Sequence, residues 1–475
     1  MTKTLSFNGY GIPKNNNNDE IMKLKEELTM TPNVNFSISS NSSSSSFPIY
    51  SENEKRLYIP RYFGLQKYGV PDKDLISDGT HCDNMIFQGT LREQQKEPVN
   101  NFIAAAEDPL KRGGIISVPC GFGKTIMSVY IACHFKKKTL FVSHKDFLNQ
   151  QFKKTVEDFV PTAKIGIIKQ SKVDVQNKEF VIASLQSLAM REYDNNIFKE
   201  FGLVIIDEVH HLGAEVFCRA FRKLNISMIL GLSATLNRKD GMRKVFEYFI
   251  GKSVYKLVKN EKIEVEVCIH KYFDTNIEYS RNLQMWNGKP NIAGMITNIC
   301  SYQPRTLYII NVIKEIIKKE KNRKILILSE RRKQLTDIEN YIKTDKDITT
   351  TIGYYVGGMT QSSLDESAQS QIILATYQMA SEGMNIPTLN TAIFASPISD
   401  IQQSIGRILR EKPSERQYIP LCIDIFDDFS VFVRKAYTRI KYYNSKKYNT
   451  KYFMENELVD LHENKNKKYE FIDDE

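Results

Sequence analysis

Short apolar runs alternate with longer amphipathic stretches along most of the chain, from Leu91 to about Phe426. Near-continuous apolar strands separated by helices are typical of a parallel sheet that is covered on both faces. The runs form one series before residue 255 and a second series after it: Gly113–Val118, Lys138–Val142, Glu179–Ser184, Leu203–Ile206 and Met228–Ser233, then Lys324–Ser329, Gly353–Gly357, Gln371–Thr376, Asn390–Ser396 and Tyr418–Phe426. The pattern therefore predicts an α/β protein with two parallel-sheet domains in tandem.

A helix is expected between the two series, because residues 305–320 carry apolar side chains at helical spacing. Its apolar face should hold Leu307, Ile310, Ile313, Ile316 and Ile317.

The N-terminal part of the chain lacks this alternation. Residues 1–49 contain an Asn15–Asn18 run and the serine-rich stretch Ser37–Ser46. Such a composition cannot bury enough apolar surface to offset chain entropy, so we expect a disordered low-complexity tail. Residues 50–90 are aromatic and punctuated by prolines, which suggests a small accessory module. The expected divisions of the chain are 1–49, 50–90, 91–255, 256–428 and 429–475.

The last of these segments is basic and aromatic, and it leaves two interpretations open. Phe429–Met454 carries seven Lys or Arg residues, eight aromatic residues and no acid. Such a segment could stack bases and follow phosphates. Equally, it could form a C-terminal helix that packs Tyr437, Ile440 and Tyr443 on the second domain.

Composition and charge narrow the class of protein. With 475 residues, 41% hydrophobic and 26% charged, the chain is globular and can bury a sizeable core. A net charge of +10 suits a polyanionic partner without proving one. Seven scattered cysteines, none in C-x-x-C spacing, argue against a zinc site or a disulfide framework. No apolar run approaches ~18 residues and the N-terminus has no signal-like region, so we expect a soluble intracellular protein without membrane contact.

The strongest local motif is a glycine-containing loop directly after an apolar strand and before a helical stretch. Its residues are Pro119, Cys120, Gly121, Phe122, Gly123, Lys124 and Thr125. Glycines let backbone N–H groups surround phosphate oxygens, and the helix N-terminus adds a positive dipole end. Lys124 would pair with the β- and γ-phosphates and Thr125 would bind Mg²⁺. Val118 stands where such loops usually have their first glycine, and a simple glycine turn feeding a helix is the alternative.

An acidic pair supports the nucleotide interpretation. The strand Leu203–Ile206 runs into Asp207 and Glu208, at the edge where α/β sheets hold ligands. Asp207 can hold Mg²⁺, and Glu208 can orient and deprotonate a water for attack on the γ-phosphate. Alone, such a pair would be an ordinary turn or cap. Together with the phosphate loop it predicts a site that hydrolyses ATP.

Four motifs in order carry a family resemblance: the phosphate loop, the DEVH of residues 207–210, the SAT of residues 233–235, and QSIGRILR of residues 403–410. This set resembles the superfamily 2 helicases and translocases, near the helicases related to the repair and transcription helicase XPB. The stretches LYIPRYFGLQKYGVP and GMNIPTLNTAIFASP resemble helicases of large DNA viruses, among them the poxviral transcript-release helicase. The resemblance implies two tandem RecA-like domains.

The resemblance also implies roles for individual residues of this chain. Gln95 matches the glutamine that reads adenine, although a surface helix residue is the alternative. Gly383 and Asn385 fall in a motif near the nucleotide, where many relatives have Asp in place of Asn385. Contacts to the nucleic-acid strand are implied for Ser143, Gln150, Ser184, Gln186 and Thr376. Coupling of the nucleotide state to domain movement is implied for His210, Ser233, Thr235 and Gln403.

Two arginines complete the implied catalytic set. Arg407 and Arg410 lie three residues apart, so on a helix both would face the same way. Guanidinium groups delivered from the opposite domain would stabilise the charge of the transferring phosphoryl group, which contributes on the order of 10³–10⁵ in rate in other enzymes. A structural salt bridge is the alternative role.

We therefore expect a monomeric, ATP- and Mg²⁺-dependent motor that moves along a nucleic-acid strand, with DNA favoured and RNA as the alternative. Viral transcription or a repair-like process is the expected setting, with the transcription machinery as a further partner. For a viral protein the expected location is the host cytoplasm, a virus factory or the virion. A translocase that displaces transcripts or proteins without unwinding would keep every motif. A nucleic-acid sensor or annealing factor is less favoured, because the chain lacks extra recognition domains.

Overall fold

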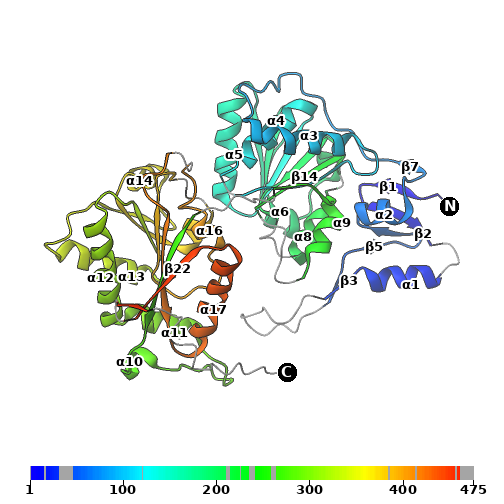
Figure 1. The fold of residues 1–475 in the computed structure, drawn as a ribbon. Helices are drawn as coiled ribbons and strands as arrows, with labels where there is room; N and C mark the ends of the chain where they lie inside the picture. The colour runs from blue at the N-terminus through cyan, green and yellow to red at the C-terminus, as the bar shows by residue number, and fades with distance from the viewer. Residues whose placement is uncertain are drawn as a thin grey trace. The chain divides into compact units, whose positions relative to one another are not determined.

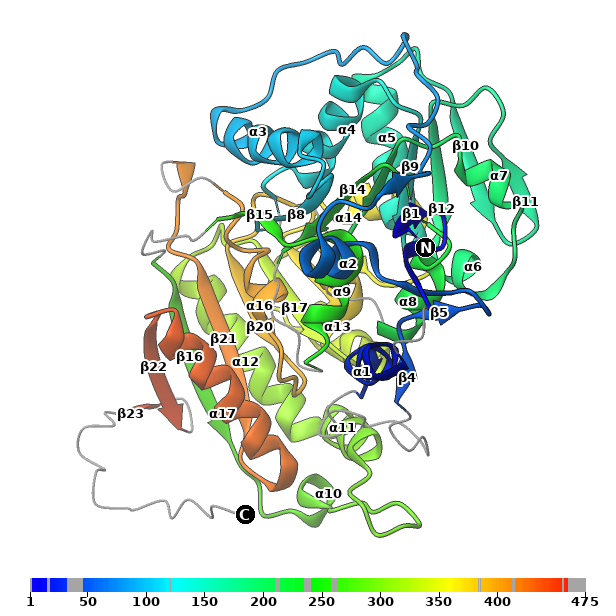
Figure 2. The ribbon, with the colours of Figure 1, turned by 90° about the vertical axis from the view of Figure 1, so that its right-hand side faces the viewer.

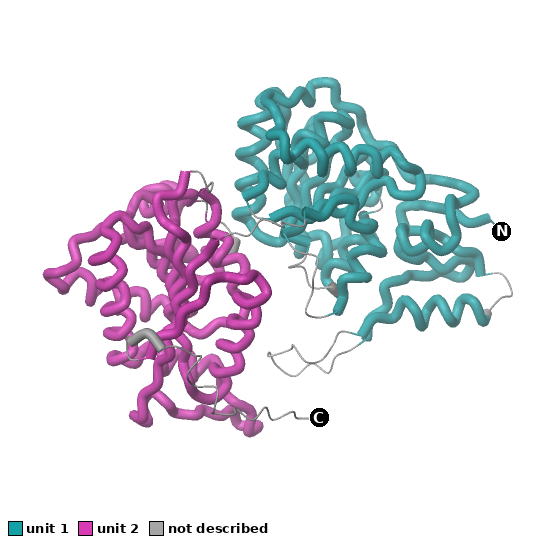
Figure 3. The backbone as a smooth tube through the Cα atoms, in the orientation of Figure 1, with its two compact units in different colours: residues 1–259 teal, residues 260–475 magenta. Residues whose placement is uncertain are grey.

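The computed structural model divides into two compact units, residues 1–259 and residues 260–475, shown separately coloured in Figure 3. The structure describes residues 2–14, 18–31, 46–119, 121–209, 214–224, 226–234, 241–257, 264–382, 384, 386–411, 415–454 and 457–459. No helix within these ranges is long and apolar enough to cross a membrane.

The core of unit 1 is an eight-stranded sheet with the order β11-β10-β12-β9-β13-β14-β8-β15 (Figure 1). Its neighbours are parallel, apart from the antiparallel pair β10 and β11. The strands are β8 (Gly113–Ser117), β9 (Thr139–Ser143), β10 (Ile165–Lys169), β11 (Lys172–Asp174), β12 (Phe180–Ser184), β13 (Leu203–Ile206), β14 (Met228–Ser233) and β15 (Ser253–Lys256).

Helices cover both faces of this sheet, because successive strand residues point to opposite sides and both sides are apolar. In β13, Leu203 and Ile205 belong to one buried cluster, and Val204 and Ile206 belong to the other. One face carries α3 (Glu93–Glu107), α4 (Lys124–Phe135) and α5 (Asp146–Phe159), and the other carries α6 (Leu185–Met190), α8 (Ala214–Phe221) and α9 (Arg243–Ile250) (Figure 1). The short helix α7 (Asn195–Phe198) precedes β13.

The N-terminal residues form a second, five-stranded sheet with the order β5-β6-β2-β1-β7. The elements of this N-terminal module are β1 (Thr4–Ser6), β2 (Gly9–Pro13), α1 (Asn18–Glu27), β3 (Thr29–Met30), β4 (Phe47–Pro48), β5 (Ser51–Glu52), β6 (Arg56–Ile59), α2 (Arg61–Tyr68) and β7 (Lys73–Asp74). The strands β3 and β4 pair separately.

The predicted disordered tail is therefore wrong for residues 2–14 and 18–31. Leu5 and Tyr10 are buried, and β1 and β2 lie in the middle of a sheet whose other strands come from residues 51–74. Tyr10 packs so closely on α2 that a Cβ at Gly64 would lie 2.3 Å from its ring. The few apolar residues of this segment are buried by contacts distant in sequence, so local composition does not reveal them. The serine-rich stretch at 37–45 lies outside the described residues.

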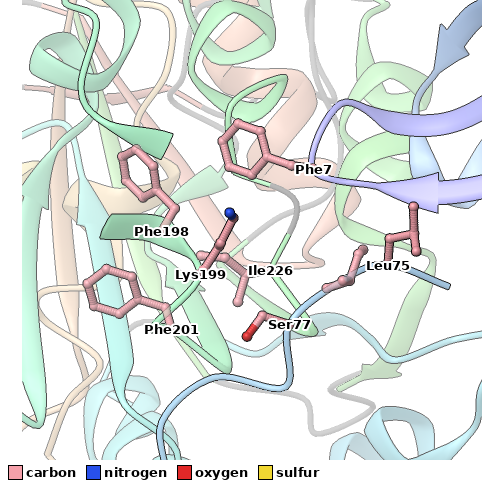
Figure 4. Close-up of a pocket in the computed structure, with 8 residues that line it drawn as sticks. Phe7, Leu75, Ser77, Phe198, Lys199, Phe201 and Ile226 are labelled. Carbon is pink, nitrogen blue, oxygen red and sulfur yellow. The ribbon is translucent and has the colours of Figure 1, made fainter. Parts of the chain in front are cut away.

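Arg61 fixes the module to the core of unit 1. Its side chain is 1% exposed, and it donates to the carbonyl oxygens of Ile226 at 2.6 Å and Ser227 at 2.8 Å, just before β14. Beside this contact, a cavity of about 290 Å³ opens between the module and the α7 region (Figure 4). Its lining residues are Phe7, Leu75, Ile76, Ser77, Phe198, Lys199, Phe201 and Ile226. The module is thus continuous with the first α/β core.

Deleting residues 1–46 should destabilise the protein, because it removes β1 and β2 from the middle of their sheet. Losing buried side chains such as Tyr10 costs ~2–5 kcal/mol each. We expect a clearly lower thermal midpoint and poorer solubility, measured by calorimetry on the full chain and the deletion. Met22→Ala, which changes an exposed side chain of α1, is the control and should leave the midpoint unchanged. A deletion with the parental midpoint would contradict the expectation.

Unit 2 is built on a second eight-stranded sheet, with the order β18-β19-β17-β20-β21-β16-β22-β23. Its neighbours are parallel, except for β22 with β23. The strands are β16 (Glu266–Tyr272), β17 (Ile325–Ser329), β18 (Ile352–Tyr355), β19 (Ile372–Thr376), β20 (Thr391–Phe394), β21 (Leu421–Asp427), β22 (Asn449–Met454) and β23 (Glu457–Val459). The helices are α10 (Ile277–Ser280), α11 (Ile292–Ser301), α12 (Gln303–Lys319), α13 (Arg332–Thr344), α14 (Gln361–Ser367), α15 (Tyr377–Glu382), α16 (Gln402–Ile405) and α17 (Ser430–Ser445).

These two units confirm the predicted fold of two parallel-sheet α/β domains. Each of the ten predicted apolar runs overlaps a strand of one of the sheets. The helix expected at 305–320 is α12, but Leu307 is 42% exposed while Ile309 is buried. At its N-terminal end, the buried face of α12 is therefore rotated by part of a turn from the predicted face.

The basic, aromatic stretch is packed structure, which favours the second of the two interpretations. In α17, Arg439 is 1% exposed and binds the equally buried Asp424 of β21 through Nε and Nη2, at 2.8 and 2.6 Å. Tyr443 donates to the same carboxylate at 2.7 Å. The strand β22 then extends the sheet beside β16. Tyr443 packs as expected, whereas Tyr437 remains 44% exposed.

Candidate active site

The glycine loop joins β8 to the N-terminus of α4. Gly121 and Gly123 have φ values of +80° and +91°, which favour glycine, and Gly123 is the residue immediately before α4. The next residue, Lys124, is buried, with its Nζ 3.5 Å from the carbonyl oxygen of Val118. The loop leads into the N-terminus of α4, a helix of twelve residues, and has a lysine at its base, so it can hold phosphate groups.

Val118 shows how the loop tolerates a residue other than glycine at its start. Its side chain is 1% exposed and belongs to the apolar cluster that includes β8. Its N–H donates to the carbonyl oxygen of Ser233 at the end of β14, at 3.1 Å. The start of the loop is therefore anchored to the strand that carries the SAT motif, and the side chain fills the core.

The acidic pair stands at the end of β13, beside this loop. Glu208 Oε1 lies 3.5 Å from Lys124 Nζ, so the two motifs meet. Burial, with the negative charge of Glu208 second, raises the pKa of Asp207 to about 7, against the opposing effect of Lys124. The Glu208 N–H donates to Asp207 Oδ1 at 2.9 Å, and Glu208 has a φ of +50°, uncommon for a side-chain-bearing residue. Such crowding of negative charge suits a divalent cation.

Gln95 lies under the loop rather than on the surface. It is 1% exposed, its Nε2 donates to the carbonyl oxygen of Phe122 at 2.8 Å, and its Oε1 accepts from the Arg92 N–H at 2.9 Å. The surface-helix alternative is therefore wrong. The amide both caps α3 and supports the loop, and sequence reasoning did not identify Arg92, whose guanidinium lies close to Gly123.

Replacing Gly123 with Ala should abolish ATP binding while most of the fold remains. An added Cβ would lie 2.2 Å from Gln95 Nε2, and the φ of +91° is strained for alanine. The loop must shift, which moves the N–H groups that would face the phosphates. Binding of a fluorescent ATP analogue is the measurement, with Gly69→Ala, whose Cβ would meet no atom within 4 Å, as a control for strain alone. Equal ATP affinity in Gly123→Ala and the parent would contradict this.

The unit 1 residues that are predicted to contact the nucleic-acid strand lie near the C-terminal ends of β9 and β12. Gln186 Nε2 donates to the carbonyl oxygen of His144 at 3.1 Å, and the Ser184 hydroxyl donates to Gln186 Oε1 at 3.0 Å. Gln150 is exposed on α5. Ser143 is instead buried, with its hydroxyl 2.8 Å from Asn149 Oδ1, so it supports this edge from below.

In unit 2, Thr376 ends β19 and is paired in register with Ser329 of β17. Gln403 is half-buried on α16. This short helix ends at Ile405, so Arg407 and Arg410 lie after it and do not share one face of a helix. Arg407 is 4% exposed and its Nη1 donates to the carbonyl oxygen of Met384 at 2.8 Å. The predicted residues outside the described part of the chain are Cys120, His210, Thr235, Gly383 and Asn385.

Two parallel-sheet domains, with a glycine loop and an acidic pair that meet at one edge of the first sheet, are typical of RecA-like ATPase domains. Residues 88–238 match the type III restriction enzyme res subunit model, and residues 308–412 match the helicase conserved C-terminal domain. Among solved structures, the helicase domain of Pyrococcus furiosus Hef aligns with a TM-score of 0.48 at 14% identity, over 75% of this chain and 98% of that one.

Curated relatives extend the match across nearly the whole chain. L396 of Acanthamoeba polyphaga mimivirus, provisionally named an ATP-dependent RNA helicase, is 37% identical over 97% of this chain and 89% of its own length. The probable helicase D10 of Escherichia phage T5 is 27% identical, over 71% of this chain and 72% of that protein. The chain belongs to the superfamily 2 helicases found in large DNA viruses, which bind nucleic acid and hydrolyse ATP.

Proposed function

We propose that the chain couples ATP hydrolysis at the loop of unit 1 to movement along one nucleic-acid strand. The observation that carries this proposal is the meeting of Lys124 with Glu208 beside Asp207 at one sheet edge. Lys124 binds the β- and γ-phosphates. Glu208 accepts the proton of the attacking water, because its carboxylate is the half-buried member of the pair.

Mg²⁺ fits the residues present. Hard oxygen ligands suit this cation, and Asp207 offers a carboxylate and Thr125 a hydroxyl. Burial, and then the charge of Glu208, raise the pKa of Asp207, so a cation beside this carboxylate would favour its ionised form. When bound, the cation supplies charge neutralisation for the phosphates. Asp207 and Thr125 would hold it, and Gln95 would keep the loop in place beneath it, with a contact to adenine as a further role.

Arg407 and Arg410 stabilise the charge that develops on the transferring phosphoryl group. Because both arginines belong to unit 2, hydrolysis depends on how the two units are arranged. Each nucleotide state therefore has its own domain arrangement. Gly383 and Asn385 belong to the same nucleotide-facing group. His210, Ser233, Thr235 and Gln403 transmit the nucleotide state to unit 2.

The nucleic-acid strand contacts the polar edge that Gln150, Ser184 and Gln186 form in unit 1, where Ser143 supports that edge. In unit 2 it contacts Thr376. Hydroxyl and amide groups suit phosphate and sugar contacts without sequence specificity. We favour DNA, in viral transcription or a repair-like process, with the transcription machinery as partner, a monomeric state, and a place in the host cytoplasm, a virus factory or the virion. RNA is the alternative, supported by the name given to L396.

The test measures ATPase stimulation by single-stranded DNA, duplex DNA and RNA side by side, followed by strand displacement with the best stimulator. Stimulation by DNA with displacement supports a DNA helicase, and stimulation by RNA alone selects the alternative. Stimulation without displacement selects a translocase that clears transcripts or proteins. Hydrolysis that no nucleic acid stimulates would overturn the proposal.

A further inference from the structure

A tight hairpin in unit 2 follows α10 and presents the single tryptophan of the chain at its tip. Gln284 and Pro290 form an antiparallel bridge, and the Met285 N–H donates to the Lys289 carbonyl at 2.8 Å. The Gly288 N–H donates to the Met285 carbonyl at 2.9 Å, with a φ of +76° at Gly288 that closes the turn. Figure 2 shows this segment as a narrow loop projecting beside α10. The bonds hold the tip in a defined shape.

The tip residue, Trp286, is 92% exposed. Its neighbour Met285 is 41% exposed, and Ile277 on α10 is 76% exposed. An indole offers a large rigid face with little conformational entropy to lose, so an exposed one on an ordered turn is well suited to contact a partner.

The charge around the tip favours a nucleic-acid partner. No Asp or Glu occurs between Glu278 and Glu315, whereas Arg281 and Lys289 flank the tip and both are exposed. The other polar groups of the loop are the amides of Asn282, Gln284 and Asn287. Cations and amides beside an aromatic face are the elements that bind a single strand without sequence preference.

The hairpin also lies at the edge of the sheet where the parallel strands end. It follows β16, and because the strands of this sheet are parallel, β16 ends at the same edge as β17 and β19. The helix after the hairpin, α11, is held there by Arg331, whose Nη2 donates to the Ala293 carbonyl and whose Nε donates to Thr297 Oγ1, both at 2.9 Å. Arg331 lies two residues beyond the end of β17, whose last residue pairs with Thr376. The hairpin is thus anchored to the sheet edge that carries Thr376, a candidate contact to the nucleic-acid strand.

We propose that Trp286 stacks on one base of the nucleic-acid strand, while Lys289 and Arg281 neutralise the neighbouring phosphates. This inference rests on the strand-dependent motor proposed above and adds a contact that the helicase motifs do not include. Stacking on an aromatic ring is tolerant of base identity, since every base has a π-face, so the contact suits a motor that must advance through any sequence.

Because the chain has one tryptophan, its fluorescence reports on this residue alone. We expect a 20-nucleotide oligothymidylate or oligouridylate to quench the indole emission of the full chain saturably, with the same midpoint as ATPase stimulation. Trp286→Ala should weaken strand affinity by about 5- to 150-fold. Trp286→Phe should retain most of the affinity, and hydrolysis without a strand should be unchanged because the side chain is 92% exposed. Lys289→Ser should reduce the slope of log affinity against log salt by about 0.7.

Ile277→Ala is the matched control, since it removes an exposed apolar side chain near the hairpin but no ring. Equal weakening by Ile277→Ala and Trp286→Ala would overturn stacking. Parental strand affinity in Trp286→Ala, with no quenching in the parent, would also overturn it and would assign the tip to a protein partner. If the parental protein shows no strand-stimulated hydrolysis, the proposed motor function fails instead.

Discussion

Replacing Glu208 with Gln should lower the rate of ATP hydrolysis by about 10²–10⁴-fold, which is the contribution of a positioned general base. The amide keeps the length of the side chain but cannot take a proton from water. Lys124 and the glycine loop are unchanged, so ATP should bind with parental affinity and hold the protein in its strand-bound state. Phosphate release and the binding of a fluorescent ATP analogue are measured together.

Two further variants make this result specific. Glu215→Gln makes the same substitution on α8, where the carboxylate is half exposed and pairs with Arg219, and it should hydrolyse ATP at the parental rate. Lys124→Ala should lose ATP affinity as well as turnover, because it removes the cation beneath the phosphates. A parental rate in Glu208→Gln would show that another group activates the water.

The phosphate loop and the acidic pair could be predicted because each is a short run of residues whose chemistry is local. The role of Gln95 could not, since it depends on the packing of α3 against a loop 27 residues away. In the same way, the anchoring of Val118 to Ser233 depends on the order of the strands, which the apolar runs do not encode. The sequence therefore predicted the glycine loop and the acidic pair, which meet at Lys124 and Glu208, better than it predicted what holds them in place.

Burial also separates the strands that the sequence predicts from those that it does not. Strands buried on both faces, such as β13 and β17, are continuous apolar runs and were predicted. The strands β10 and β22 are partly exposed, and β16 contains His270 and Lys271, so none of them forms such a run and all three were missed. In the N-terminal sheet, β1 and β2 pair with each other locally, but their outer partners β7 and β6 lie more than 40 residues further along the chain, so the short N-terminal runs do not predict the sheet.

Buried charge is the feature that the sequence hides most completely. Arg439 stands in a segment with seven cations, and nothing local distinguishes it from its exposed neighbours. Its partner, Asp424, lies in the mainly apolar strand β21, 15 residues earlier. This buried ion pair is thus one of the contacts that pack α17 on β21, together with its buried apolar residues, and its removal is the second large effect that we expect.

Asp424→Ala should destabilise unit 2 by ~3–5 kcal/mol, because it leaves the Arg439 guanidinium buried without its counter-charge. The carboxylate also accepts from Tyr443, so a buried hydroxyl loses its partner too. Glu266→Gln, which breaks the partly exposed pair with Lys451, is the control and should cost at most ~1 kcal/mol. The double change Asp424→Leu with Arg439→Leu should recover part of the loss, since it removes both charges. Urea unfolding followed by circular dichroism gives the three values, and an Asp424→Ala variant no less stable than Glu266→Gln would show that α17 is not held by this pair.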